Sequence, residues 1–149
     1  MTLTIVSPIT GDAVPLTSVP DPVFSAALVG PGTAVDPDRS HGTVVSPIDG
    51  RVTKLLPHAF VVLAESGQGV LVHLGIDTVQ LDGDGFTLLV NQGDYVKAGM
   101  PIVMWDPSWV EANGRSPVCP VVALDAQPDQ ISDCAQGNVA AGDVLFTWH

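Results

Sequence analysis

The sequence predicts an all-β fold, a duplicated-hairpin barrel or sandwich with a few short helical turns. Its apolar residues fall into many short alternating runs, the pattern of strands that turn one face to a core. Fifteen glycines and thirteen prolines separate these runs, as is typical of the tight corners of barrels and sandwiches. A chain of 149 residues is long enough for a sizeable core, so we expect residues 1–149 to form a single domain.

Two short motifs occur twice along the chain. Ser-Pro-Ile-Thr-Gly at residues 7–11 returns as Ser-Pro-Ile-Asp-Gly at 46–50, and residues 93–99 return in similar form at 137–142. The spacing of the copies is irregular, which argues against a solenoid. The repeats therefore predict a duplicated hairpin unit.

The N-terminal segment predicts two short strands within residues 3–16, then a helical turn, then a solvated loop at 36–42. Asp21 precedes a proline, the combination of N-cap and first-turn residue that begins many helices. Phe24 is the aromatic residue of this turn, and it belongs either to the core or to an exposed contact beside a site.

A β-hairpin is predicted next, and the rest of the chain is organised around it. Two runs rich in Val and Leu, 58–63 and 70–73, are joined by a polar connection with two glycines. His58 opens the first run and His73 ends the second, so antiparallel pairing brings them together to within a register step or two. Directly opposed side chains in such a ladder are roughly 5 Å apart at Cβ. The two imidazoles are therefore expected to share one small site.

The C-terminal half predicts further short elements. They are a helical turn at 78–80, strands at 86–90, 101–105, 117–124 and 144–148, and short helices at 106–114 and 128–135.

Imidazole chemistry allows two kinds of site at the histidine pair. A neutral ring nitrogen is both a nucleophile and a metal ligand, and the apolar strands favour the neutral form. Asp77, four residues after His73, could orient a ring or tune its basicity. A third interpretation is that each histidine is an ordinary strand residue. Spacing alone does not choose among these.

Composition limits the partners. Five Lys and Arg residues against sixteen Asp and Glu give a net charge of −11, which argues against nucleic acid and anionic membranes and favours a basic protein. No apolar stretch approaches the roughly 20 residues of a membrane span, and there is no secretory signal, so we expect a cytoplasmic protein without direct membrane insertion. Cys119 and Cys134 are too few for a disulfide framework and are expected to be reduced and buried.

The hairpin region resembles the glucose-type enzyme IIA domain of the bacterial phosphoenolpyruvate:sugar phosphotransferase system. The resemblance is carried by His-Ala-Phe at 58–60, Val-His-Leu-Gly-Ile-Asp-Thr-Val at 72–79 and Leu-Asp-Gly-Asp-Gly-Phe at 81–86. The motifs at 46–50 and 93–99 extend it over nearly the whole chain.

The resemblance implies a phosphoryl carrier, and we expect it to be a freestanding monomer that needs neither a cofactor nor a metal. His73 would accept phosphate from the phosphocarrier protein HPr and pass it to the IIB domain of a membrane sugar permease. His58 would support the phosphoryl group by a hydrogen bond, with Gly75 and Asp77 as further supporting residues. Neither the sugar nor the permease is specified by this sequence.

The resemblance also implies a shallow apolar patch around the histidines, on which both partners dock. Leu71 precedes His73 by two residues and so lies on the same face of its strand. The acidic residues Asp21 and Asp77 would form a rim that steers a basic donor. The predicted patch consists of Phe24, Leu56, Leu71 and Val79.

One departure from the family concerns the segment before His58. Better-known members carry a hydroxyl residue there that hydrogen-bonds the histidine pair, whereas residues 54–57 contain neither Ser nor Thr. The group that fixes the imidazole tautomer is left open between Asp77 and a backbone carbonyl. No Lys or Arg lies between residues 55 and 96, which suits a labile carrier better than a tight phosphate binder.

Two other functions compete with the carrier. A zinc-dependent hydrolase of related duplicated-hairpin architecture would use His58, His73 and Asp77 as ligands around an open position, although the usual two-histidine motifs are missing. A biotin- or lipoate-bearing domain would need a modified lysine at a hairpin tip, and Lys97 is the candidate.

Overall fold

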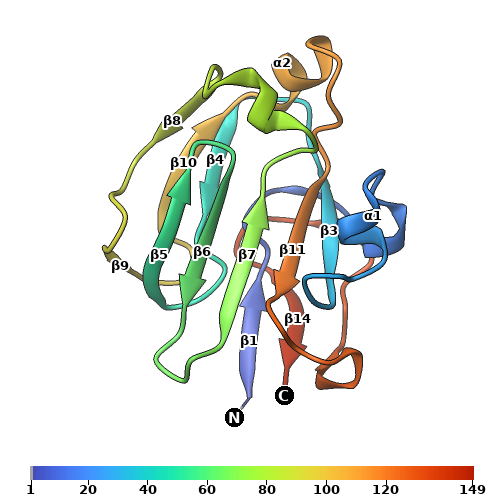
Figure 1. Ribbon diagram of the computed structural model, residues 1–149, viewed down its shortest axis with the longest axis vertical. Helices are drawn as coiled ribbons and strands as arrows, with labels where there is room; N and C mark the ends of the chain where they lie inside the picture. The colour runs from blue at the N-terminus through green and yellow to red at the C-terminus, as the bar shows by residue number, and fades with distance from the viewer. Residues whose placement is uncertain (1) are drawn as a thin grey trace.

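The structure, a computed structural model, describes residues 2–149 and confirms the all-β prediction (Figure 1). Antiparallel strands form three sheets, and the helices are short. The strands are β1 Leu3–Val6, β2 Gly11–Pro15, β3 Gly32–Pro37, β4 Gly42–Val45, β5 Gly50–Leu56, β6 Ala59–Leu63, β7 Gly69–His73, β8 Phe86–Leu88, β9 Tyr95–Val96, β10 Pro101–Trp105, β11 Cys119–Ala123, β12 Ile131–Ser132, β13 Gly137–Val139 and β14 Val144–Trp148. The helices are α1 Pro22–Ser25 and α2 Pro107–Ala112, and the 3-10 turns are η1 Leu16–Ser18, η2 Thr78–Leu81 and η3 Pro128–Gln130.

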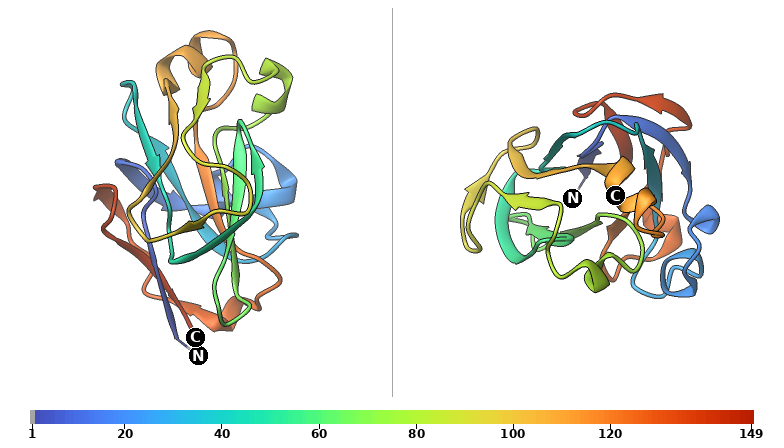
Figure 2. Two further views of the ribbon diagram at one scale, coloured as in Figure 1. Left: turned by 90° about the vertical axis from the view of Figure 1, so that its left-hand side faces the viewer. Right: turned by 90° about the horizontal axis from the view of Figure 1, so that it is seen from above.

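The largest sheet has eight strands in the order β13-β2-β3-β11-β7-β6-β5-β9. Two three-stranded sheets, β1-β14-β12 and β4-β10-β8, complete the fold. Seen from above, the strands surround a central core (Figure 2). Because β1 and β14 are antiparallel, with Leu3 opposite Trp148, the two ends of the chain lie together at the bottom of Figure 1.

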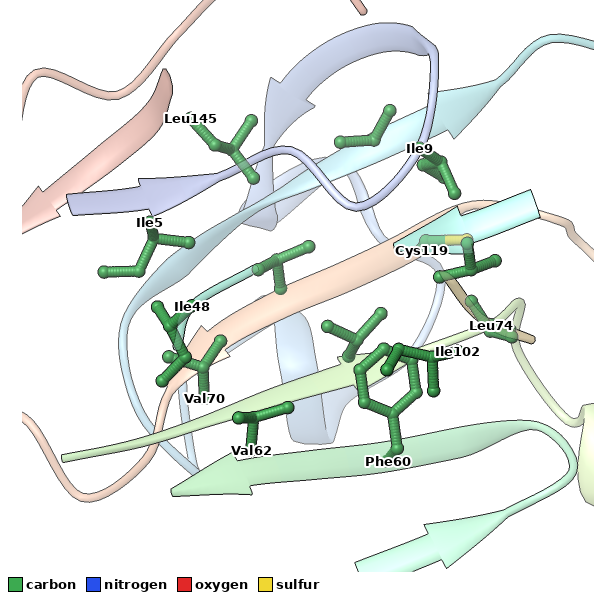
Figure 3. Close-up of a cluster of buried hydrophobic side chains, with 14 of the residues drawn as sticks. Ile5, Ile9, Ile48, Phe60, Val62, Val70, Leu74, Ile102, Cys119 and Leu145 are labelled. Atoms are coloured by element: carbon green, nitrogen blue, oxygen red, sulfur yellow. The ribbon is translucent and has the colours of Figure 1, made fainter. Parts of the chain in front are cut away.

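The main core fills the space between the three sheets. Phe60 and Val62 of β6 alternate with outward residues and point into it, as do Val70 and Val72 of β7. The small sheets contribute large side chains from the other side, so that the side chains interdigitate (Figure 3). These are Ile5, Val44, Ile102, Val103, Trp105, Leu145 and Phe146. Burial of this apolar surface is the main source of stability for such a sheet protein.

A second apolar cluster covers the outer face of the large sheet. Leu16, Val19 and Phe24 come from η1, α1 and the segment between them. They pack on residues that alternate with the core-facing ones, among them Ala34 of β3 and Val122 of β11. The connection between β2 and β3 thus lies against the same face as the outward residues of β7. Asp21 caps α1 as predicted, since its carboxylate accepts a hydrogen bond from the amide of Val23 at 2.9 Å.

The two copies of the Ser-Pro-Ile motif form matching turns. The buried hydroxyl of Ser7 donates to the carbonyl of Ile9 at 2.6 Å, and that of Ser46 donates to the carbonyl of Ile48 at 2.7 Å. The turns also bond to each other, with the amide of Val6 donating to the carbonyl of residue 47 and the amide of Val45 donating to that of residue 8. The strands after them pair alike: β2 lies between β13 and β3, and β5 lies between β9 and β6. A duplicated hairpin unit therefore explains both sequence repeats.

Three local predictions were wrong. The helix predicted at 128–135 is the single turn η3 followed by β12, because Ile131 and Ser132 pair with β14 instead of continuing the turn. The first two residues of the loop predicted at 36–42 belong to β3, because β3 pairs with β2 as far as Pro37. Cys119 is buried as expected, but Cys134 is exposed.

Among residues 2–149, no helix is both long enough and apolar enough to cross a membrane.

Candidate functional site

The structure brings His58 and His73 together where β6 begins and β7 ends. In the β6–β7 ladder Ala59 lies opposite His73, and the amide of Leu74 donates to the carbonyl of His58 at 2.7 Å. Strict alternation would send the side chains of His58 and Ala59 to opposite faces. However, His58 belongs to the tight turn between β5 and β6, and its ring lies beside that of His73. The ring centroids are 5.2 Å apart and the planes meet at 69°, which confirms the predicted shared site.

A backbone carbonyl fixes the orientation and tautomer of His73. The Nδ1–H of His73 donates to the carbonyl of Gly75 at 2.5 Å. Because a carbonyl only accepts, Nδ1 holds the proton of the neutral ring and Nε2 keeps a free lone pair. Of the two groups considered from the sequence, Asp77 and a backbone carbonyl, the carbonyl therefore performs this role.

Gly75 makes this geometry possible. Its φ is +79°, and a Cβ there would lie 2.7 Å from Cγ2 of Thr78 and 2.9 Å from the carbonyl oxygen of Ser116. Only glycine adopts such a conformation in so little space without strain. The loop is tied down by the amide of Ile76, which donates to Ser116, and by the hydroxyl of Thr78, which donates to the carbonyl of Leu74.

Of the predicted patch residues, Leu56 and Leu71 line a cavity with the histidines and Phe24 contacts His73, while Val79 lies on η2, and the four differ in exposure. Phe24 is only 7% exposed, and its ring centroid lies 5.2 Å from that of His73, so it mainly supports the ring. Leu71 is partly buried, whereas Leu56 and Val79 are 39% and 60% exposed. Leu56 and Val79 thus offer more surface to a partner than Phe24 does.

The environment keeps both imidazoles neutral near pH 7. Burial lowers the pKa of His73 below its ordinary value, although its hydrogen bond to Gly75 and the charges of Asp21 and Asp77 raise it in part. Burial also lowers the pKa of His58, and the neighbouring His73 lowers it further. A neutral His73 with a free Nε2 is able to act as a nucleophile at physiological pH.

A cavity of about 240 Å³ adjoins the histidines and is mostly apolar. Its lining includes Lys54, which the sequence analysis did not place at the site. The hairpin register would have revealed it, because Lys54 lies two residues before Leu56 on the same strand face. The lining residues are Lys54, Leu56, His58, Ala59, Phe60, Val61, Leu71 and His73.

The arrangement does not provide the ligand set of the zinc alternative. That alternative needs Asp77 as a third ligand, yet no three His, Cys, Asp or Glu side chains within the described part of the chain are placed to hold a metal ion. In addition, Nδ1 of His73 already donates to a carbonyl. The geometry therefore favours the nucleophile over the metal site.

Comparison with known proteins identifies similar chains over most of this length. A family model described as phosphoenolpyruvate-dependent sugar phosphotransferase system, EIIA 1, matches residues 3–128. The chain is 43% identical over 122 residues to the PTS system glucose-specific EIIA component of Oceanobacillus iheyensis, covering 80% of this chain and 73% of that one. It is 45% identical over 143 residues to the PTS system N-acetylglucosamine-specific EIICBA component of Escherichia coli, covering 93% of this chain but 22% of that protein. The solved structure of glucose permease IIA from Mycoplasma capricolum superposes with a TM-score of 0.91 at 31% identity, covering 99% of this chain and 96% of that one.

Proposed function

The chain belongs to the EIIA 1 family of the phosphoenolpyruvate-dependent sugar phosphotransferase system, and from this premise we propose that Nε2 of His73 carries the phosphoryl group. The protein is a phosphoryl carrier of that system. The observation that supports the assignment to His73 is its hydrogen bond to Gly75, which leaves Nε2 unprotonated.

The transfer step follows from this tautomer. The lone pair of Nε2 attacks the phosphorus of a phosphohistidine on the donor, and the donor N–P bond breaks as the new N–P bond forms in line with it. No proton has to leave His73, because Nδ1 holds the ring proton before and after the step. The carbonyl of Gly75 accepts that proton's hydrogen bond throughout, so the ring is positioned before the donor arrives.

His58 acts as a supporting group. Its neutral ring can donate one hydrogen bond to a phosphoryl oxygen, and its centroid lies 5.2 Å from that of His73. Gly75 and Asp77 support His73 in different ways, Gly75 through its carbonyl and Asp77 through its charge. The acidic rim formed by Asp21 and Asp77 favours a basic donor surface.

We propose the phosphocarrier protein HPr as the donor and the IIB domain of a membrane sugar permease as the acceptor. The family supports this pairing, and so does the similarity to an EIICBA component, in which the matched region makes up 22% of a longer chain. The partners would dock on Leu56, Leu71 and Val79, with an edge of Phe24. Residues 1–149 would work as one domain and as a monomer in the cytoplasm, without nucleic acid, cofactor or membrane insertion.

The test is phosphorylation from phosphoenolpyruvate in the presence of enzyme I and HPr, followed by intact mass spectrometry. We expect a gain of one phosphate that is lost in acid and survives base, as a phosphohistidine does. His73→Ala should abolish this gain, whereas His58→Gln should still accept phosphate and pass it on more slowly. Unchanged melting temperatures would show that both variants are folded. Phosphorylation of His73→Ala would contradict the assignment, and loss of acceptance in His58→Gln would make His58 the nucleophile.

A further inference from the structure

A β-bulge in β5 decides which way Lys54 points. Val52 lies opposite Val62, and Lys54 lies opposite Val61. Thr53 is therefore an extra residue in β5 that has no partner in β6. Val52 points into the core, and without the bulge Lys54 would point there too. The bulge instead turns Lys54 outward, because an inserted residue switches the face of every side chain that follows it.

After the bulge, the outward residues of three strands form two adjacent rows. One row contains Leu56, Ala59 and His73, which lie opposite one another across β5, β6 and β7. The next row contains Lys54, Val61 and Leu71 in the same order. Lys54 is therefore one row away from His73 on the same face, and both side chains line the same 240 Å³ cavity.

Lys54 has no acidic partner of its own. The described residues hold their Lys/Arg ion pairs at Arg39, which contacts Asp36 and Glu111, and none of these pairs involves Lys54. On a chain of net charge −11, an unpaired ammonium group beside the two histidines is the one cation among the residues that line the cavity. Its remaining lining is apolar or imidazole, so a charge placed there is screened less than in open water.

We infer that Lys54 binds the phosphoryl group on His73 and offsets its negative charge during transfer. This inference rests on the proposed function. A phosphoryl group brings a charge of about −1.5 to −2 and three acceptor oxygens to the cavity, and an ammonium group on a flexible stem can follow it from donor to acceptor. No covalent bond to the Lys54 nitrogen forms or breaks. Lys54 is exposed, and a lysine ammonium is a point charge without the bidentate geometry of arginine, so it holds the group weakly enough for onward transfer.

The test compares Lys54→Met, Lys54→Arg and the control Lys97→Met, which removes an exposed lysine outside the cavity. The first readout is a phosphorus NMR pH titration of each phosphorylated protein. A nearby ammonium favours the dianion, so Lys54→Met should raise the phosphoryl pKa by about 0.3. The other two variants should match the wild type. The second readout is the single-turnover rate of phosphate acceptance from phosphorylated HPr, which should fall about twofold to fivefold in Lys54→Met alone.

Each outcome separates the alternatives. An unchanged phosphoryl pKa in Lys54→Met would overturn the inference, even if the rate falls, because Lys54 would then act on the donor protein and not on the phosphoryl group. Equal effects of Lys54→Met and Lys97→Met would also overturn it, since general charge would explain both. If the wild-type chain accepts no phosphate, the proposed function itself fails and the inference fails with it. Acceptance by the wild type with a normal Lys54→Met titration would remove the inference alone.

Discussion

The two Ser-Pro-Ile turns have nearly the same structure, but the connections that follow them differ completely. The amide of Ser7 donates to the carbonyl of Asp143 at 2.7 Å, and the amide of Ser46 donates to that of Met100 at 2.8 Å. After the second turn, β5 returns as β6 through two residues, one of which is His58. After the first turn, β2 returns as β3 only after residues 16–31, which form η1 and α1.

The repeated turns and the unlike connections differ in their relation to His73. The repeated turns have matching hydrogen bonds, and their Ser, Pro and Ile residues are buried in both copies, so we assign them to the framework of the fold. The two unlike connections meet at His73: one supplies His58, and the other supplies the ring of Phe24 and the charge of Asp21. The duplicated turns thus form a common frame, and the residues that contact His73 come from the connections in which the two copies differ.

The largest loss of stability is expected when the last glycine of each turn is replaced. A Cβ on Gly11 would lie 2.2 Å from the carbonyl oxygen of Asp36, and one on Gly50 would lie 2.3 Å from that of Leu63. We expect Gly11→Ala and Gly50→Ala each to lower the free energy of unfolding by about 2–4 kcal/mol, measured by urea denaturation, because the paired backbone must move apart. Gly42→Ala is the control, since the nearest atom to its Cβ is 3.9 Å away. A difference of more than about 1.5 kcal/mol between the two variants would mean that the turns are not equivalent.

Replacing the serines of the same turns is expected to lower the free energy of unfolding by a smaller amount. Ser7 and Ser46 are fully buried, and each hydroxyl donates to the carbonyl two residues later. Replacement by Ala leaves that carbonyl with one partner fewer, so Ser7→Ala and Ser46→Ala should each cost about 1–2 kcal/mol. Denaturation curves should shift equally for both, while Ser66→Ala in an exposed loop should stay within about 0.5 kcal/mol of the wild type. A large cost at only one turn would break the comparison.

The smallest expected effect is a shift in the pKa of His73 when the charge of Asp21, in the first connection, is removed. Asp21 raises the pKa of His73, so Asp21→Asn should lower it and leave more of the ring neutral near pH 6. Asparagine is as good an N-cap as aspartate, so α1 should remain intact. The measurement is an NMR titration of the histidine ring protons, with the exposed Asp12→Asn as control because Asp12 is not among the causes of the shift at His73. An unchanged or raised midpoint for His73 would show that the charge of Asp21 does not act on His73.

Most of the fold was accessible from the sequence because its signals are local. Alternating apolar runs with glycine-containing connections predicted the β6–β7 hairpin, and an aspartate before a proline predicted the starts of α1 and α2. The error at 128–135 has a nonlocal cause. Residues 127–130 have the side-chain bonds of a helix start, but β12 pairs with β14, which no local pattern reveals.

The candidate site was less accessible because it depends on register and on contacts between distant segments. The pairing of His58 and His73 followed from the hairpin alone. The bond from Nδ1 of His73 to Gly75 required the positive φ of Gly75. The two-residue spacing from Leu56 is a sequence signal for Lys54, whereas the bulge at Thr53 that turns Lys54 outward has none. The contact between Phe24 and His73 joins residues 49 positions apart in sequence, through a connection of irregular structure.

The pairing of β1 with β14 also determines where the chain can be attached to another protein or circularly permuted. Its two ends lie together at the bottom of Figure 1, whereas β7, whose last residue is His73, runs upward from there. A tether attached at either end would leave from the bottom of the molecule, and β7 runs away from that end toward His73. The same closeness means that a short peptide could join the ends, so new termini could be opened at an exposed loop such as residues 65–67 by circular permutation.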